Sequence, residues 1–77
     1  MGELVEMLAK ALVDNPDEVQ VNEIEEDSKS IIIELKVASQ DMGKVIGKQG
    51  KIANAIRTLV KSMAIKENKK VNVNIVE

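Results

Sequence analysis

The sequence predicts an α+β domain, in which three helices cover one face of a three-stranded sheet. Three observations support this prediction. Apolar residues recur at helical spacing in three stretches and alternate with polar residues in three others. These stretches follow one another in the order α-β-β-α-α-β. The chain has 77 residues, of which 44% are apolar and all of those aliphatic, which suffices for one small core. We therefore expect residues 1–77 to form a single domain with one sheet.

The first element is an amphipathic helix. Its apolar positions recur every three or four residues: Leu4, Val5, Leu8, Ala11 and Leu12. Asn15 and Pro16 end this helix, because the residue before a proline disfavours the helical region.

Two strands follow and form an antiparallel hairpin. Val19 and Val21 begin the first strand, which runs towards Glu25, although Ile24 interrupts the alternation and predicts a bulge or an early end. Residues 26–29 are polar and favour a turn. The second strand, over residues 30–38, alternates well, with one face formed by Ile31, Ile33, Leu35 and Val37.

The second half of the chain predicts two helices and a closing strand. Ser39 suits an N-cap and Asp41 a first helical turn, so a short helix runs to about residue 46. A glycine-containing turn separates it from a helix over residues 51–66, and Asn68 suits the end of that helix. The predicted core stripe of this helix is Ile52, Ile56, Leu59, Val60 and Met63. Alternation over residues 71–75 indicates the last strand.

The composition excludes several functions. Without His or Cys, the chain has no usual zinc site, no disulfide and no Ser-His or Cys-His nucleophile pair. We therefore expect a non-enzyme without a cofactor. Without Phe, Tyr or Trp it offers no aromatic platform on which bases could stack. Neither a leader nor a long apolar run is present, which predicts a cytoplasmic protein.

Charge is divided unevenly along the chain. Residues 1–27 carry nine acidic residues and one basic residue, a net charge of −8, and the rest carry ten basic and four acidic residues, a net +6. This division predicts a molecule with one acidic and one basic side, which can bind phosphates although the net charge is −2. An acidic cluster could hold a divalent ion, but solvated carboxylates are the simpler interpretation: Glu23, Glu25, Glu26 and Asp27.

The most informative motif is Gly47-Lys48-Gln49-Gly50, at the joint between the two predicted helices. Two glycines three positions apart allow a ligand to approach the backbone without meeting a Cβ. The joint also opens the following helix, whose free N–H groups favour phosphate, and Lys48 and Lys51 add positive charge. Together these features predict a clamp for a phosphodiester backbone.

With this motif, the chain resembles a KH domain, a module in which a GXXG loop clamps nucleotides. The element order is similar to the type II KH arrangement. The resemblance is closer to the small bacterial KhpA (YlqC-like) KH proteins and covers essentially the whole chain. It is carried mainly by residues 12–16, 41–53 and 55–59. One departure is Ala53, where many KH domains have Ile.

The resemblance implies single-stranded RNA binding by an RNA chaperone or post-transcriptional regulator. It also implies a larger KhpB (Jag)-type partner and links to cell-wall biogenesis, cell shape and cell-length control. The RNA-binding residues that it implies are Gly47, Lys48, Gln49 and Gly50 in the clamp, Lys44 and Val45 before it, and Lys51, Asn54 and Arg57 after it.

The same residues allow other interpretations. The glycines could form a simple tight turn, and residues 43–48 resemble a P-loop with one residue too few between the glycines and no Ser or Thr after Lys48. The small core and the charge division also fit a homodimer or a protein-interaction module. A KH protein for single-stranded DNA is a third alternative. Four lysines in the last third of the chain are best interpreted as a solvated face: Lys61, Lys66, Lys69 and Lys70.

Overall fold

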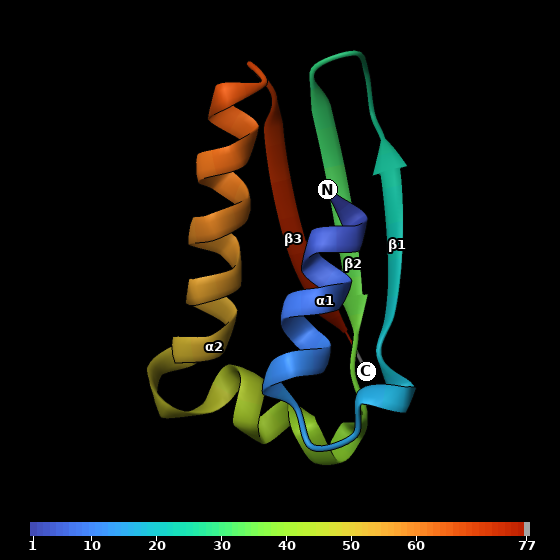
Figure 1. Ribbon diagram of the computed structural model, residues 1–77, viewed down its shortest axis with the longest axis vertical. Helices are drawn as coiled ribbons and strands as arrows, with labels where there is room; N and C mark the ends of the chain where they lie inside the picture. Colours follow the sequence, from blue (N-terminus) through green and yellow to red (C-terminus); the bar gives the residue numbers. More distant parts are fainter. Residues whose placement is uncertain (77) are drawn as a thin grey trace.

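The computed structural model describes residues 1–76, and for Lys48 and Gln49 it describes the backbone only. Its elements are helix α1 (Gly2–Leu12), the 3-10 turn η1 (Pro16–Glu18), strands β1 (Gln20–Glu25) and β2 (Ser30–Lys36), helix α2 (Ser39–Lys66) and strand β3 (Lys70–Val76). The helices lie on one face of the sheet (Figure 1), which confirms the predicted α+β class.

The three strands form a mixed sheet in the order β1-β2-β3. Strands β1 and β2 pair antiparallel, as predicted, whereas β2 and β3 run parallel. Register is continuous from Gln20 opposite Lys36 to Glu25 opposite Ile31. The bulge or early end predicted at Ile24 is therefore wrong, because the pairing of the backbones outweighs the misplaced apolar side chain.

The core lies between the central strand and the two helices. Ile31, Ile33 and Leu35 of β2 are buried on the helix side, as their alternation predicted. Val5 and Ala9 of α1 and Val73 of β3 pack in the same cluster. Since β2 and β3 are parallel, the chain must cross over between them, and α2 makes this crossover.

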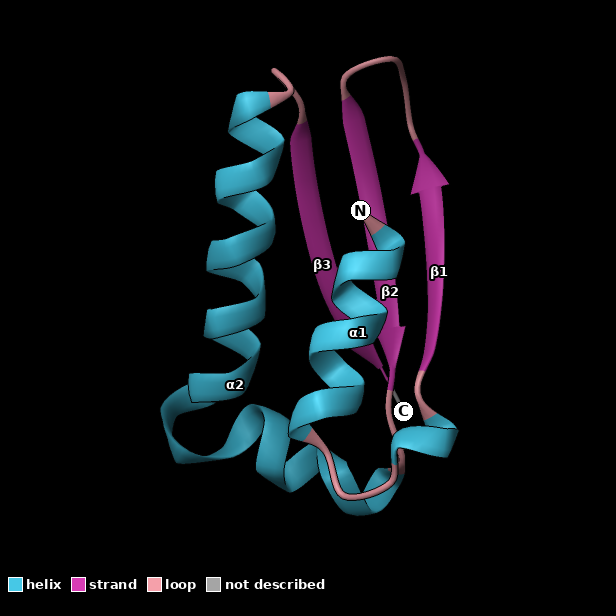
Figure 2. Ribbon diagram, viewed as in Figure 1, coloured by secondary structure: helices cyan, strands magenta, loops and turns pink. Residues whose placement is uncertain are grey.

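Helix α2 differs from the prediction of two helices, because residues 39–66 form one continuous helical assignment (Figure 2). Its axis nevertheless changes direction sharply (Figure 1). Gly50 has a φ of 68°, in the left-handed region that glycine adopts without steric cost. The glycine motif therefore bends the helix where the sequence predicted an interruption.

The buried stripe of α2 also differs from the predicted one. Ile56 and Val60 are in the core as expected, but Leu59 and Met63 are 50% and 46% exposed. The buried side of the helix is thus turned about the helix axis from the predicted one. The core side is completed by the small residues Ala53 and Ala64 instead.

The ends of α2 bear out one prediction and correct another. Asn68 has a φ of 59°, and the N–H groups of Asn68 and Lys69 donate to Ile65 O and Ala64 O, at 3.0 and 2.8 Å. This confirms Asn68 as a helix terminator. Ser39, by contrast, is the first helical residue, Ala38 is the N-cap, and no described side chain caps the start of the helix. Asp41 lies in the first turn of α2, as predicted, and its carboxylate binds the segment that follows α1.

Candidate nucleic-acid interface

The GXXG motif occupies the bend of α2, and its two glycines differ in what the fold requires of them. Gly50 is required by its positive φ. Gly47 has no such φ, and a Cβ built on it would meet none of the described residues within 4 Å. Within the described part of the chain, neither backbone conformation nor packing therefore explains Gly47, and the space beside it is open. The side chains of Lys48 and Gln49, both assigned to the clamp, lie outside the described residues.

The two residues assigned to the helix before the motif have different environments. Lys44 is exposed, and its Nζ lies 3.1 Å from Asp14 Oδ1 in an ion pair. Val45 is 1% exposed and packs in the core. Its side chain therefore supports this wall of the interface from within and presents no surface to a ligand.

Two of the three residues assigned after the motif lie on one exposed side of α2. Lys51 and Asn54 line a shallow depression together with Thr58 and Leu59. Ala53, the departure from the common KH pattern, is 3% exposed. The departure therefore changes the core and leaves this exposed side unaffected.

Arg57 lies at a different place, beside the free edge of β3. Its Nε donates to the carbonyl oxygen of Val73 at 3.2 Å. Lys70 N and Val76 O bond on the β2 side of the strand. Because backbone groups in a strand alternate in direction, the carbonyl of Val73 faces outward, where Arg57 reaches it. Arg57 thus joins the second half of α2 to the edge of the sheet.

A groove runs between the second half of α2 and β3, with a volume of about 780 Å³. Among the described residues that line it, none is acidic and four are cationic: Arg57, Lys61, Lys69 and Lys70. The three lysines were interpreted from the sequence as part of a solvated face together with Lys66. The parallel crossover brings Lys61, Lys69 and Lys70 to one groove.

The predicted division of charge is visible in the strand order. β1 lies at one edge of the sheet and carries Glu23 and Glu25, whereas the cationic groove lies along β3 at the other edge. Within residues 1–76 no three acidic side chains come close enough to hold a metal ion. In this part of the chain, no helix has the length and apolar character needed to cross a membrane.

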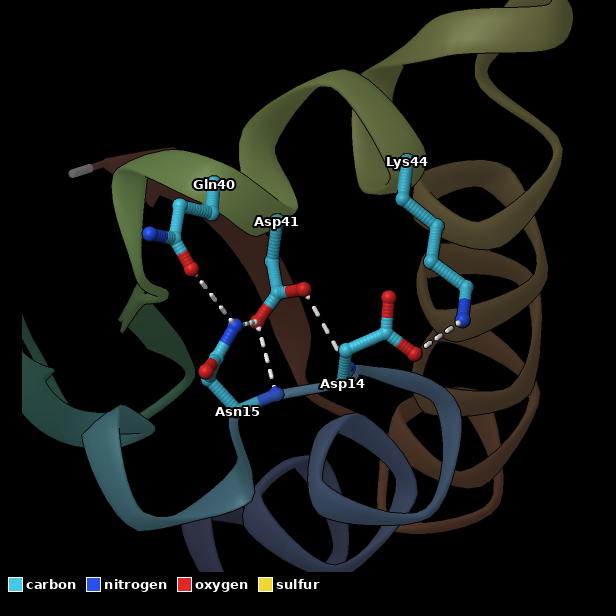
Figure 3. Close-up of polar contacts among 5 residues, drawn as sticks. All are labelled: Asp14, Asn15, Gln40, Asp41 and Lys44. Carbon is cyan, nitrogen blue, oxygen red and sulfur yellow. Dashed lines mark hydrogen bonds and ion pairs between the residues drawn. The ribbon is translucent and has the colours of Figure 1, made fainter.

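Sequence reasoning did not find the polar network that holds the start of α2. Asp41 is 1% exposed. Its carboxylate accepts hydrogen bonds from the backbone N–H groups of Asp14 and Asn15, at 3.2 and 3.0 Å, and from Asn15 Nδ2 at 3.2 Å (Figure 3). From the sequence, a carboxylate in a first helical turn is expected to interact with its own helix. Only the structure shows that Asp41 binds the segment after α1.

Comparison with known proteins supplies the family. The family model for the KhpA/KhpB KH domain matches residues 2–75 of the sequence. A protein named RNA-binding protein KhpA from Caldanaerobacter subterraneus subsp. tengcongensis is 71% identical over 99% of this chain and its own full length. Proteins of the same name from Clostridium perfringens and Aquifex aeolicus are 66% and 49% identical, over 99% and 100% of this chain and 100% and 96% of their own lengths. No solved structure matches. The chain therefore belongs to the KhpA/KhpB KH-domain family.

Proposed function

We propose that this protein binds single-stranded RNA without catalysis, with the sugar-phosphate backbone held at Gly47–Gly50. The observation that carries the proposal is the bend of α2 at this motif, where Gly50 has a positive φ and the described residues leave open space beside Gly47. A ligand that approaches the backbone closely gives that glycine a role. The family, and relatives named RNA-binding proteins, support the same conclusion.

The groove beside β3 suits the nucleotides that follow the clamp. Its cations can neutralise phosphates, and the outer edge of β3 offers backbone groups for hydrogen bonds to bases. Aliphatic side chains such as Ile65 and Val71 line it in place of aromatic ones. We therefore expect contacts centred on the RNA backbone, with modest affinity and weak sequence preference.

A series of single glycine-to-alanine substitutions tests the clamp. Gly47→Ala is expected to keep or raise stability, because alanine favours a helix over glycine by about 1 kcal/mol, and yet to weaken RNA binding. Gly43→Ala is the matched control: its Cβ also meets nothing within 4 Å, but it lies outside the motif, so binding should be unchanged. Gly50→Ala should cost about 1–2 kcal/mol of unfolding free energy, because alanine resists a φ of 68°.

Fluorescence anisotropy of a labelled single-stranded RNA measures binding, and urea unfolding followed by circular dichroism measures stability. Equal affinities for the Gly43→Ala and Gly47→Ala proteins would remove the case for a clamp at Gly47. Competition with DNA of the same sequence decides between the two nucleic acids. Stronger competition by DNA would replace RNA with single-stranded DNA as the ligand.

A second function, self-association, is favoured by an apolar stripe on α2. Leu59 and Met63 are four residues apart and therefore lie on the same side of the helix, half exposed, with the partly buried Ile52 seven residues before Leu59. A core as small as this one supplies only about 3–5 kcal/mol of net stability. Burial of the stripe against a second copy would add to it, and two weak RNA grooves would gain avidity.

Sedimentation equilibrium at high micromolar concentration tests self-association. The unmodified protein is expected to dimerise, and a Leu59→Glu/Met63→Glu protein to remain monomeric because charges would be buried at the interface. Ile65→Glu is the control, since Ile65 is 67% exposed but lies outside the stripe. A strict monomer before any substitution would contradict this second function.

The finer biological role that we propose rests on the family. It is that of a cytoplasmic RNA chaperone or post-transcriptional regulator acting with a KhpB (Jag)-type partner, in cell-wall biogenesis and the control of cell shape and length. One family model describes KH domains of both KhpA and KhpB. A KhpB-type domain of the same shape could therefore replace the second copy at the apolar stripe.

A further inference from the structure

The ion pair between Lys44 and Asp14 joins the interface to the acidic part of the chain. Lys44 Nζ lies 3.1 Å from Asp14 Oδ1, and the two side chains are 45% and 75% exposed. Figure 3 shows the lysine extending from α2 towards the segment that follows α1. The position that a phosphate oxygen would take at this ammonium group is thus held by a carboxylate of the protein itself.

The carboxylate of Asp14 is held near Lys44 by a second contact. The backbone N–H of Asp14 donates to Asp41 Oδ1, and that of Asn15 to Asp41 Oδ2. Asp41 is buried and belongs to the same helical turns as Lys44. Asp41 and Lys44 are three residues apart on α2. The backbone that carries Asp14 is therefore fixed to the helix that carries Lys44.

Lys44 is also close to the clamp along α2. It precedes Gly47 by three residues, and residues three apart in a helix lie on the same face. Lys44 and Gly47 therefore lie on the same face of this part of α2. A phosphate bound at Gly47 would compete with Asp14 for the same cation.

We propose that Asp14 limits the affinity of the interface by competing with phosphate for Lys44. The proposal deepens the RNA-binding function proposed above and rests on it. RNA binding must first separate Lys44 from Asp14, and it then leaves an unpaired carboxylate close to the bound phosphates. Asp14 is an affinity-setting residue in this role and makes no contact with RNA.

The test is a double-mutant cycle in RNA affinity. Asp14→Asn keeps the backbone N–H that Asp41 binds and removes only the competing charge. It is expected to tighten binding about 1.5- to 5-fold at low salt, the range that an exposed ion pair allows. The gain should shrink at high salt, where exposed charges are screened. Asp14→Asn in a Lys44→Gln background should gain little.

Glu26→Gln is the matched control, because it removes one negative charge at the far end of the molecule. Glu26 lies in the turn between β1 and β2, whereas the start of α2 lies at the opposite end of an extent of 35 Å (Figure 1). That separation is well beyond the Debye length of about 10 Å at 0.1 M salt. The gain in RNA affinity from Glu26→Gln should therefore be much smaller than that from Asp14→Asn.

The outcomes separate this proposal from the proposed function. Equal gains for Asp14→Asn and Glu26→Gln, or an undiminished gain in the Lys44→Gln background, would overturn the role of Asp14 while RNA binding at the clamp still stands. A protein that does not bind single-stranded RNA, or whose binding ignores Gly47→Ala, overturns both. Matching circular dichroism spectra and urea midpoints ensure that the compared proteins are equally folded.

Discussion

Replacement of Lys48 and Gln49 by aspartate is expected to abolish RNA binding and to leave the fold intact. The double substitution changes the charge of the clamp by three units and places two carboxylates where phosphates are proposed to bind. Hydrogen bonds to charged groups are worth about 1.5–3 kcal/mol each. The loss of two such contacts lowers affinity by about 100-fold or more.

The salt dependence of binding by the unmodified protein gives a second measurement of the same contacts. If two or three phosphates are neutralised, the logarithm of the binding constant should fall against the logarithm of salt concentration with a slope of about −1.5 to −2. For the double variant, whatever binding remains should show a smaller slope, because fewer phosphates are neutralised.

A matched control carries the same change in charge on the face of the sheet away from the helices. Gln20 and Lys36 are exposed and lie opposite each other at one end of the β1–β2 pair. Gln20→Glu/Lys36→Glu should therefore weaken binding far less than Lys48→Asp/Gln49→Asp. If the Lys48→Asp/Gln49→Asp protein is folded and binds RNA as tightly as the unmodified one, the clamp is wrongly placed.

The largest expected loss of stability comes from Asp41→Ala. The buried carboxylate satisfies two backbone N–H groups and one side-chain amide of the segment after α1. Alanine leaves these donors without their acceptor, and it removes a negative charge that the start of a helix favours. We expect a cost of about 2–4 kcal/mol, comparable to the whole stability of a domain of this size.

Urea unfolding followed by far-UV circular dichroism measures this loss, since the chain has no aromatic fluorophore. Gln40→Ala is the control: the neighbouring Gln40 is exposed, and its Oε1 accepts one long hydrogen bond of 3.4 Å from Asn15 Nδ2. It should change the unfolding free energy by less than about 0.5 kcal/mol. Equal midpoints for the two variants would contradict a structural role for Asp41.

Sequence patterns predicted the elements well where local chemistry decides them. Alternation identified Ile31, Ile33 and Leu35 as the buried face of β2, and the order of the elements predicted the α+β class. The glycine motif and its place at a bend also followed from the sequence, because glycine is the residue that adopts a positive φ. These features depend on a residue and its near neighbours.

The sequence predictions were wrong where the burial of a residue depends on which neighbouring element covers it. Leu59 and Met63 fit the helical spacing of a core stripe, yet α2 packs against the core with a neighbouring side and leaves them half exposed. Val45 was expected at the surface of the interface and is in the core. Spacing alone indicates which residues share a helix face, but not how much of that face another element covers.

The sequence alone thus predicted the strands and their order, the place of the bend and the uneven charge along the chain. Which charges meet depends on the three-dimensional fold. Asp14 and Lys44 are 30 residues apart and form an ion pair, and Arg57, Lys61, Lys69 and Lys70 line one groove. The parallel crossover and the hydrogen bonds of Asp41 to the segment after α1 join distant parts of the chain. No local sequence pattern records such contacts.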